Sequence, residues 1–189
     1  MIEHSDQAVL RVLAETLDVA ETCARLGLSR AELRQCLERS AEAHAHEILP
    51  APEPGGELTL NIDGAARGNP GPAGAGVVVW RGEKVFEEFC KYLGKATNNQ
   101  AEYQALILAL EQALELGARE VIVRSDSELL VKQVLGQYRI KNPELRSLFQ
   151  KAAALMRRFD RFRIQHVPRE QNAEADRMAN RAIDEFAPG

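Results

Sequence analysis

The chain has 189 residues, of which 45% are apolar and 28% charged, enough for one medium globular domain with a smaller companion. Its formal net charge of −4 excludes a uniformly basic nucleic-acid binder, so any affinity for a polyanion must come from a local patch. No apolar run approaches the roughly 20 residues that a membrane span needs, and the first residues, MIEHSDQ, lack the basic start of a secretory signal. Three cysteines without a Cys-x-x-Cys pair predict reduced thiols and a cytoplasmic location.

Residues 1–49 predict a small helical domain. An apolar stripe along residues 9–17 predicts a first helix, and a second helix is expected to end at Gly27. Ser29 and Glu32 form a Ser-x-x-Glu capping box that opens a third helix.

The rhythm of residues 6–48 is similar to that of a helix-turn-helix motif. Residues 1–50 nevertheless carry nine acidic side chains against five arginines and no lysine, whereas a DNA reader needs a basic face. We therefore expect this domain to mediate dimerisation or protein contact, with nucleic-acid contact as the alternative. Residues 50–57, with three prolines and two glycines, predict a linker to a second domain over residues 58–189.

Residues 58–189 alternate between strand and helix patterns. In chain order the predicted strands are 58–63, 74–81, 84–92, 119–125 and 161–167, and the predicted helices are 98–116, 127–136, 143–158 and 172–186. The second and third strands are expected to form a hairpin around Gly82. This order predicts an α/β fold with a mixed sheet.

Four carboxylates stand at the ends of these elements. Asp63 closes the first strand and Asp126 the fourth, while Glu102 and Asp176 lie in the first turns of two helices. A right-handed crossover makes the fourth strand parallel to the first, so Asp63 and Asp126 are expected side by side at one sheet edge. Helix starts project towards the same edge, so the four acids should converge. Glu102 or Asp176 alone is equally well explained by the preference of acids for helix N-termini.

Converging carboxylates need a counter-charge. They repel one another and raise each other's pKa values, and divalent cations relieve this repulsion. An all-oxygen ligand set selects Mg²⁺ or Mn²⁺ over zinc. Two such ions roughly 4 Å apart form a clamp suited to in-line displacement at phosphorus.

Four segments, DGAARGNPGPAGAG, TNNQAEY, SDSELLVKQ and HVPREQNAEAD, together resemble the motifs of a type 1 ribonuclease H domain, over residues 58–187. The resemblance implies a five-stranded mixed sheet with helices on both faces. It also implies endonucleolytic cleavage of the RNA strand of an RNA–DNA hybrid, with two metal ions, leaving 3′-hydroxyl and 5′-phosphate ends. The positions that match the metal-binding and catalytic acids are Asp63, Glu102, Asp126 and Asp176.

The resemblance also implies a set of substrate contacts. Asn69, Asn98 and Asn99 match positions that contact the hybrid in its minor groove, and Thr97 matches one that binds a phosphate of the DNA strand. Gly64 lacks a β-carbon, so the nucleic-acid backbone is expected to approach closely there. The Gly68-Asn69-Pro70-Gly71 turn is expected to place the Asn69 amide outward. The simpler alternatives are a mere hairpin turn there and a helix N-cap at Asn98 or Asn99.

His166 matches, by its distance from Asp176, a histidine that assists proton transfer or product release in some relatives. The segment HVPREQN lacks their glycine-rich loop, so a structural histidine is the alternative. Glu128 replaces a substrate-contacting glutamine of some relatives, and GQYRIKNPEL is too short for the basic, Trp-bearing protrusion that others carry. Residues 139–163 carry eight basic and two acidic side chains, which predicts a phosphate-binding patch.

The sequence therefore predicts a cytoplasmic ribonuclease H that acts on RNA–DNA hybrids and uses Mg²⁺ or Mn²⁺. The alternatives are an inactive ribonuclease-H-like binding protein and a nuclease that prefers double-stranded RNA or RNA–DNA junctions.

Overall fold

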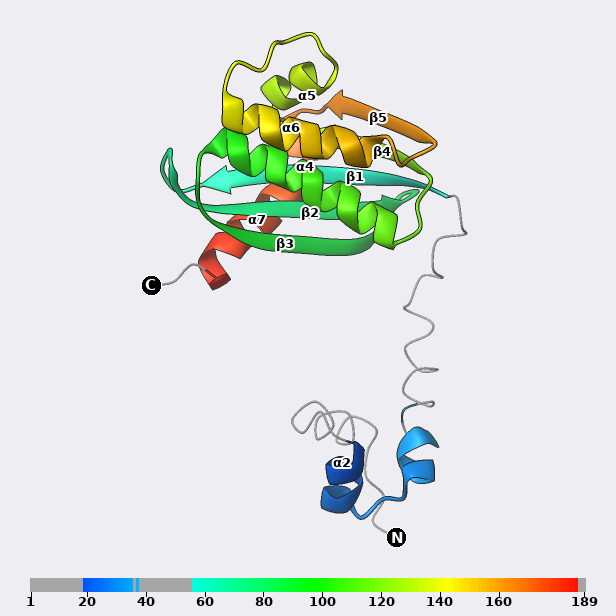
Figure 1. Ribbon diagram of the computed structural model, residues 1–189. Coiled ribbons are helices and arrows are strands. Elements are labelled where there is room, and N and C mark those ends of the chain that lie inside the picture. The colour runs from blue at the N-terminus through cyan, green and yellow to red at the C-terminus, as the bar shows by residue number, and fades with distance from the viewer. Residues whose placement is uncertain (1–18, 36, 38–55, 187–189) are drawn as a thin grey trace. The chain divides into compact units, whose positions relative to one another are not determined.

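The computed structural model describes residues 19–35, 37 and 56–186 of the chain. The chain divides into two compact units, Met1–Pro50 and Ala51–Gly189 (Figure 1). The helix predicted for residues 9–17 and nearly all of the predicted linker, residues 50–57, lie outside the described residues. Within the described ranges, no helix is long and apolar enough to cross a membrane.

The first unit contains helix α2 (Val19–Leu26) and a further helical stretch that begins at residue 30. The predicted capping box is confirmed, because the Ser29 N–H donates to Glu32 Oε2 (2.8 Å) and the Glu32 N–H donates to Ser29 Oγ (3.2 Å). Leu33, only 2% exposed, is packed by apolar residues of both helices. The part of this unit that the structure describes is thus a small helical pair around one buried leucine.

The second unit is built on a five-stranded sheet, which confirms the predicted fold class. The strand order is β3-β2-β1-β4-β5. The strands are β1 (Glu57–Ala66), β2 (Gly71–Arg81), β3 (Lys84–Ala96), β4 (Glu120–Ser125) and β5 (Arg161–His166). β1, β2 and β3 pair antiparallel, whereas β4 pairs parallel with both β1 and β5. The sheet is therefore mixed, with a parallel half and an antiparallel half.

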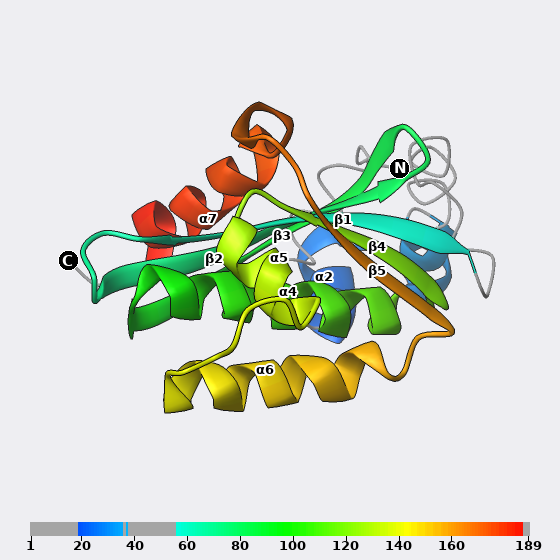
Figure 2. The ribbon, with the colours of Figure 1, turned by 90° about the horizontal axis from the view of Figure 1, so that it is seen from above.

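Helices cover both faces of this sheet, also as predicted (Figure 2). α4 and α6 lie on one face and α7 on the other. The helices are α4 (Asn98–Glu115), α5 (Glu128–Val134), α6 (Pro143–Met156) and α7 (Ala173–Phe186), with a short 3₁₀ turn, η1 (Arg169–Gln171), before α7. Leu58, Leu60 and Ile62 of β1 belong to the core cluster beneath α4 and are at most 1% exposed. Each such side chain stabilises the fold by about 1.5–3 kcal/mol.

Two glycines of β2 let α7 pack directly on the sheet backbone. A β-carbon built on Gly76 would lie 2.3 Å from the Ala175 carbonyl oxygen and 2.4 Å from the Ala179 nitrogen. A β-carbon on Gly74 would lie 2.3 Å from the Ala179 carbonyl oxygen. The backbone of α7 thus occupies the space that larger residues in β2 would need.

We expect Gly76→Ala to lower the free energy of unfolding by about 2–3 kcal/mol, because the helix backbone must move to admit the methyl group. Thermal unfolding should show a fall in Tm of several degrees. Gly94→Ala is the control, since a β-carbon there meets nothing within 4 Å and tests only the cost of its φ of 70°. Equal losses in the two variants would show that packing against α7 is not the cause.

Candidate active site

Strand register brings Asp63 and Asp126 to the same level of the sheet. β1 and β4 pair in parallel as far as Ile62 and Ser125, and the two aspartates are the residues that follow these two in the chain. The prediction that Asp63 ends its strand was wrong, because β1 continues to Ala66 by pairing with β2. Asp63 therefore pairs with β2 on one edge of β1, whereas on its other edge the pairing with β4 has already ended.

Glu102 enters from α4, at its fifth residue, so the prediction that it lies in the first turn was wrong by one position. It is 6% exposed, and its helix packs directly on β1. A β-carbon on Gly64 would lie 2.2 Å from both the Ala101 carbonyl carbon and the Glu102 nitrogen. The missing β-carbon of Gly64 therefore makes room for α4, and so for the placement of Glu102; its substrate role stays a prediction.

Asp176 lies in the first turn of α7, where the sequence placed it. Its Oδ1 accepts a hydrogen bond from Arg169 Nη2 (2.7 Å), and its Oδ2 accepts one from Asn180 Nδ2 (3.2 Å). A hollow of about 290 Å³ brings the four acids together. It is lined by Asp63, Gly64, Ala65, Ala66, Asn98, Glu102, Asp126, Arg169, Asp176 and Asn180.

Burial and mutual repulsion perturb two of these acids. Burial, with the charges of Asp126 and Asp176, raises the pKa of Asp63 to about 7, although Arg169 and a backbone N–H oppose the shift. Burial, and then the charges of Asp63 and Asp126, raise the pKa of Glu102 well above its ordinary value. The hollow therefore disfavours the ionised forms of Asp63 and Glu102 when no cation is bound.

The donor set fits a hard divalent cation. Glu102 Oε2 is buried and has no hydrogen-bond partner among the residues that the structure describes. In that same part of the chain, no three His, Cys, Asp or Glu side chains are arranged so that they could hold a metal ion. The four carboxylates repel one another, and an ion with oxygen ligands would offset that repulsion.

Arg169 is a site residue that sequence reasoning missed. Its guanidinium lies at the rim of the hollow, 75% exposed, and pairs with Asp176. It is thus an internal counter-charge for one of the four acids. The signal for it was available in HVPREQN, where a basic residue stands seven positions before Asp176, but that segment was interpreted only for its histidine.

The predicted substrate residues gather at the start of α4. Thr97, not an asparagine, is the N-cap, and it forms a capping box with Gln100. Asn69 Oδ1 accepts a hydrogen bond from the Asn98 N–H (3.3 Å), so the Asn69 side chain docks on this helix start instead of pointing wholly outward. Asn98 and Asn99 are exposed, and Asn98 also lines the acidic hollow.

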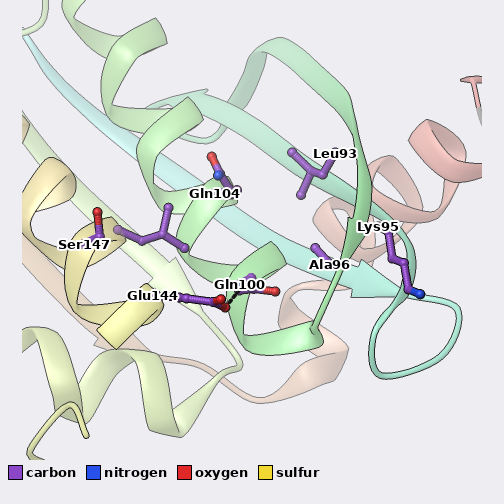
Figure 3. A pocket seen from close by; sticks show the side chains of 8 residues that line it. Leu93, Lys95, Ala96, Gln100, Gln104, Glu144 and Ser147 are labelled. Atoms are coloured by element: carbon purple, nitrogen blue, oxygen red, sulfur yellow. Dashed lines mark hydrogen bonds between the residues drawn. The ribbon is translucent and has the colours of Figure 1, made fainter. Parts of the chain in front are cut away.

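A second hollow, of about 360 Å³, lies between the end of β3, the start of α4 and α6 (Figure 3). It is lined by Leu93, Lys95, Ala96, Gln100, Gln104, Glu144, Ser147 and Leu148. Gln100 and Glu144 point toward each other, with Gln100 Nε2 donating to Glu144 Oε2 (2.6 Å), while Lys95 points away from them. Gln100 therefore links the Thr97 cap to α6.

His166 is not brought into the acidic hollow. It is the last residue of β5 and exposed, and its Nε2 lies 3.2 Å from the Asp126 carbonyl oxygen. This contact ties the ring to the backbone that carries Asp126, which favours the structural alternative.

The basic stretch at residues 139–163 is less positive in the fold than in the sequence. Three of its eight basic side chains pair with acids from other elements, in the ion pairs Lys151–Glu111, Arg161–Glu120 and Arg163–Glu57. A sequence window does not include these distant partners. The predicted phosphate-binding patch is therefore reduced to the remaining basic residues of the stretch.

The residues of the second unit also match a known protein family and several curated relatives. The family described as "Reverse transcriptase-like" matches residues 61–182. Ribonuclease HI of Halobacterium salinarum is 44% identical over 135 residues, which are 71% of this chain and 68% of that protein. Bifunctional protein Rv2228c of Mycobacterium tuberculosis is 45% identical over 133 residues, 69% of this chain but only 36% of that relative, so the chain matches about a third of its length.

Solved structures agree. The crystal structure of RNase H1 from Halobacterium salinarum superimposes with a TM-score of 0.68 at 44% identity, covering 69% of this chain and 99% of that one. LC11-RNase H1, solved in complex with an RNA/DNA hybrid, gives a TM-score of 0.66 at 44% identity, with coverage of 69% and 99%. With this fold, this acidic hollow and these relatives, the chain belongs to the type 1 ribonuclease H family.

Proposed function

We propose that the second unit is an endoribonuclease that hydrolyses the RNA strand of RNA–DNA hybrids, leaving 5′-phosphate and 3′-hydroxyl ends. The observation that carries the proposal is the single hollow lined by Asp63, Glu102, Asp126 and Asp176. The solved complex of the relative LC11-RNase H1 with an RNA/DNA hybrid supports the choice of substrate.

The four carboxylates would hold Mg²⁺ or Mn²⁺, two ions being expected once substrate is present. When bound, such ions activate water for attack on the phosphodiester and stabilise the charge on the leaving oxygen. Asp63 and Glu102 must give up their protons to serve as ligands, because metal binding competes with protonation. Arg169 orients Asp176 before that happens, through the charge-assisted hydrogen bond from Arg169 Nη2 to Asp176 Oδ1.

The start of α4 would bind the nucleic acid. A helix N-terminus attracts phosphate through its free N–H groups and its dipole, and Thr97 adds a hydroxyl there. Asn69, Asn98 and Asn99 present amides that can both donate to and accept from a 2′-hydroxyl. We assign His166 to the support of the Asp126 backbone and not to proton transfer.

The first unit would serve dimerisation or protein contact. Its acidic balance, nine acidic side chains against five arginines and no lysine over residues 1–50, favours protein contact over nucleic-acid contact.

The test offers labelled RNA–DNA hybrid, double-stranded RNA, an RNA–DNA junction, double-stranded DNA and single-stranded RNA in parallel, each with Mg²⁺, with Mn²⁺ and with EDTA. We expect metal-dependent cleavage of the hybrid with 5′-phosphate products. Tight hybrid binding without cleavage would instead identify a binding protein. If double-stranded RNA or the junction is cleaved faster than the hybrid, that nucleic acid is the preferred substrate and the hybrid is not.

A further inference from the structure

Two buried asparagines lie directly behind the acidic hollow. Asn172, 1% exposed, sits between η1 and α7, and Asn61, 5% exposed, lies on β1 two residues before Asp63. Neither was singled out by its sequence pattern. Buried amides are costly unless their hydrogen bonds are made, so their partners show what they hold in place.

Asn172 occupies a helix-capping position but its side chain turns inward. Its carbonyl oxygen accepts from the Asp176 N–H (3.1 Å), the first turn of α7. An asparagine there ordinarily caps its own helix. Here the Asn172 Nδ2 donates instead to the Ile62 carbonyl oxygen (2.9 Å) and to Asp126 Oδ1 (2.8 Å). One side chain thus joins the start of α7 to β1 and to Asp126.

Asn61 holds Asn172 in that orientation. The Asn61 Nδ2 donates to Asn172 Oδ1 (3.1 Å) and to the Gln171 carbonyl oxygen (3.0 Å). With its oxygen held this way, Asn172 must direct its NH₂ group at Ile62 and Asp126. Rotating either amide by 180° would replace these donor–acceptor contacts with unfavourable ones.

The arrangement is retained although it leaves a polar atom unpaired. Asn61 Oδ1 is buried and has no hydrogen-bond partner in the described part of the chain. A leucine of similar size would avoid that penalty but would lose both donors. Residues that reduce stability in this way are typical of functional sites.

We propose that Asn61 and Asn172 are a positioning pair that fixes the Asp126 carboxylate and the start of α7, so that Asp126 and Asp176 are presented to a divalent ion in the shared hollow. This inference rests on the proposed function for its metal site. Asn61 hydrogen-bonds Asn172 and the Gln171 carbonyl oxygen, so it acts on Asp126 and on the start of α7 through these neighbours. Groups that orient metal ligands typically change metal affinity or activity by about 10–100-fold when removed.

The test uses Asn61→Leu in the full chain. We expect the Mn²⁺ dissociation constant, measured by calorimetry without nucleic acid, to rise about tenfold. The kcat on hybrid should fall by a similar factor, with KM within about twofold. Gln165→Leu is the matched control, because Gln165 is an exposed residue in the same register row of the sheet, two strands away. It should leave both quantities unchanged.

A folded Asn61→Leu variant with wild-type Mn²⁺ affinity and kcat would overturn the proposal, whatever its Tm. If that variant does not fold, Asn172→Asp is used instead. It keeps the shape of the side chain but replaces the NH₂ donor to Asp126 with a carboxylate oxygen. Unchanged Mn²⁺ affinity of Asn172→Asp would again overturn the proposal. If the wild-type chain binds Mn²⁺ but cuts no nucleic acid, the proposed function fails, while the calorimetric difference still tests the pair.

Discussion

Asp63→Asn is expected to lower kcat on the hybrid by about 10³-fold or more while leaving hybrid affinity nearly unchanged. Asp63 is central to the hollow, and its charge acts on Glu102 and Arg169. An asparagine keeps the shape but is a much weaker ligand for a hard cation. Metal ions supply several kcal/mol of transition-state stabilisation, and about 4 kcal/mol corresponds to a thousandfold change in rate. Single-turnover cleavage and hybrid titration measure the two effects separately.

The same substitution should stabilise the protein. Asp63 is 7% exposed, and its raised pKa shows that burying the ionised form is unfavourable. Removing that charge should raise the free energy of unfolding at pH 8, in EDTA, by about 1–3 kcal/mol. Loss of activity with a gain in stability is the signature of a functional residue rather than a structural one.

Asp160→Asn is the matched control, because Asp160 is an exposed acid whose ion pair with Arg119 lies outside the hollow. We expect activity within about twofold and a change in stability within about 0.5 kcal/mol. Full activity of Asp63→Asn would show that Asp63 is not a metal ligand, and the proposed mechanism would then be wrong.

Most of the fold was predictable because its signals are local. The hairpin at Gly82, the long α4 helix and the β-branched β4 strand each follow from residues near in sequence. The error at Asp63 arose because Asp and Gly are poor strand formers, so Asp-Gly was interpreted as the end of β1. Pairing with residues 73–76 of β2 overrides that propensity and continues the strand.

The convergence of the four acids in one hollow was also predictable, since parallel strand ends and helix starts meet at one sheet edge. The supporting residues were not. The Asn61–Asn172 bond joins residues 111 positions apart, and nothing in either local pattern indicates it. The contact that explains the missing β-carbon of Gly64, with the backbone of α4 at Ala101, could not be predicted because Ala101 is 37 positions away in the chain; its substrate role stays a prediction. Side chains that hold a site in place depend on tertiary contacts, which local sequence patterns do not encode.

Stability in EDTA should carry a pH dependence that divalent ions reverse. The pKa of Asp63 is about 7 in the folded protein, against an ordinary value of 3.8. Between pH 4 and 7 the folded state therefore binds more protons than the unfolded state, so this group's contribution to stability falls as pH rises and is fully lost above about pH 7. The shift of about 3 pKa units sets an upper limit of about 4 kcal/mol. Glu102 shifts in the same direction and adds to the slope.

Comparison with Asp63→Asn isolates this effect from the other titrating groups. The variant should be more stable than the wild type in EDTA by a small margin at pH 5, where Asp63 is protonated only in the folded state, and by a larger margin at pH 8. Added Mg²⁺ should raise the wild-type Tm at pH 8 but not at pH 5, because protons compete with the ion for the same oxygens. Thermal unfolding of both proteins at four pH values between 5 and 8, in EDTA and in Mg²⁺, gives the Tm values that these comparisons need. A constant difference between the two proteins across that range would show that Asp63 is ionised throughout, and that its charge is already compensated without a metal ion.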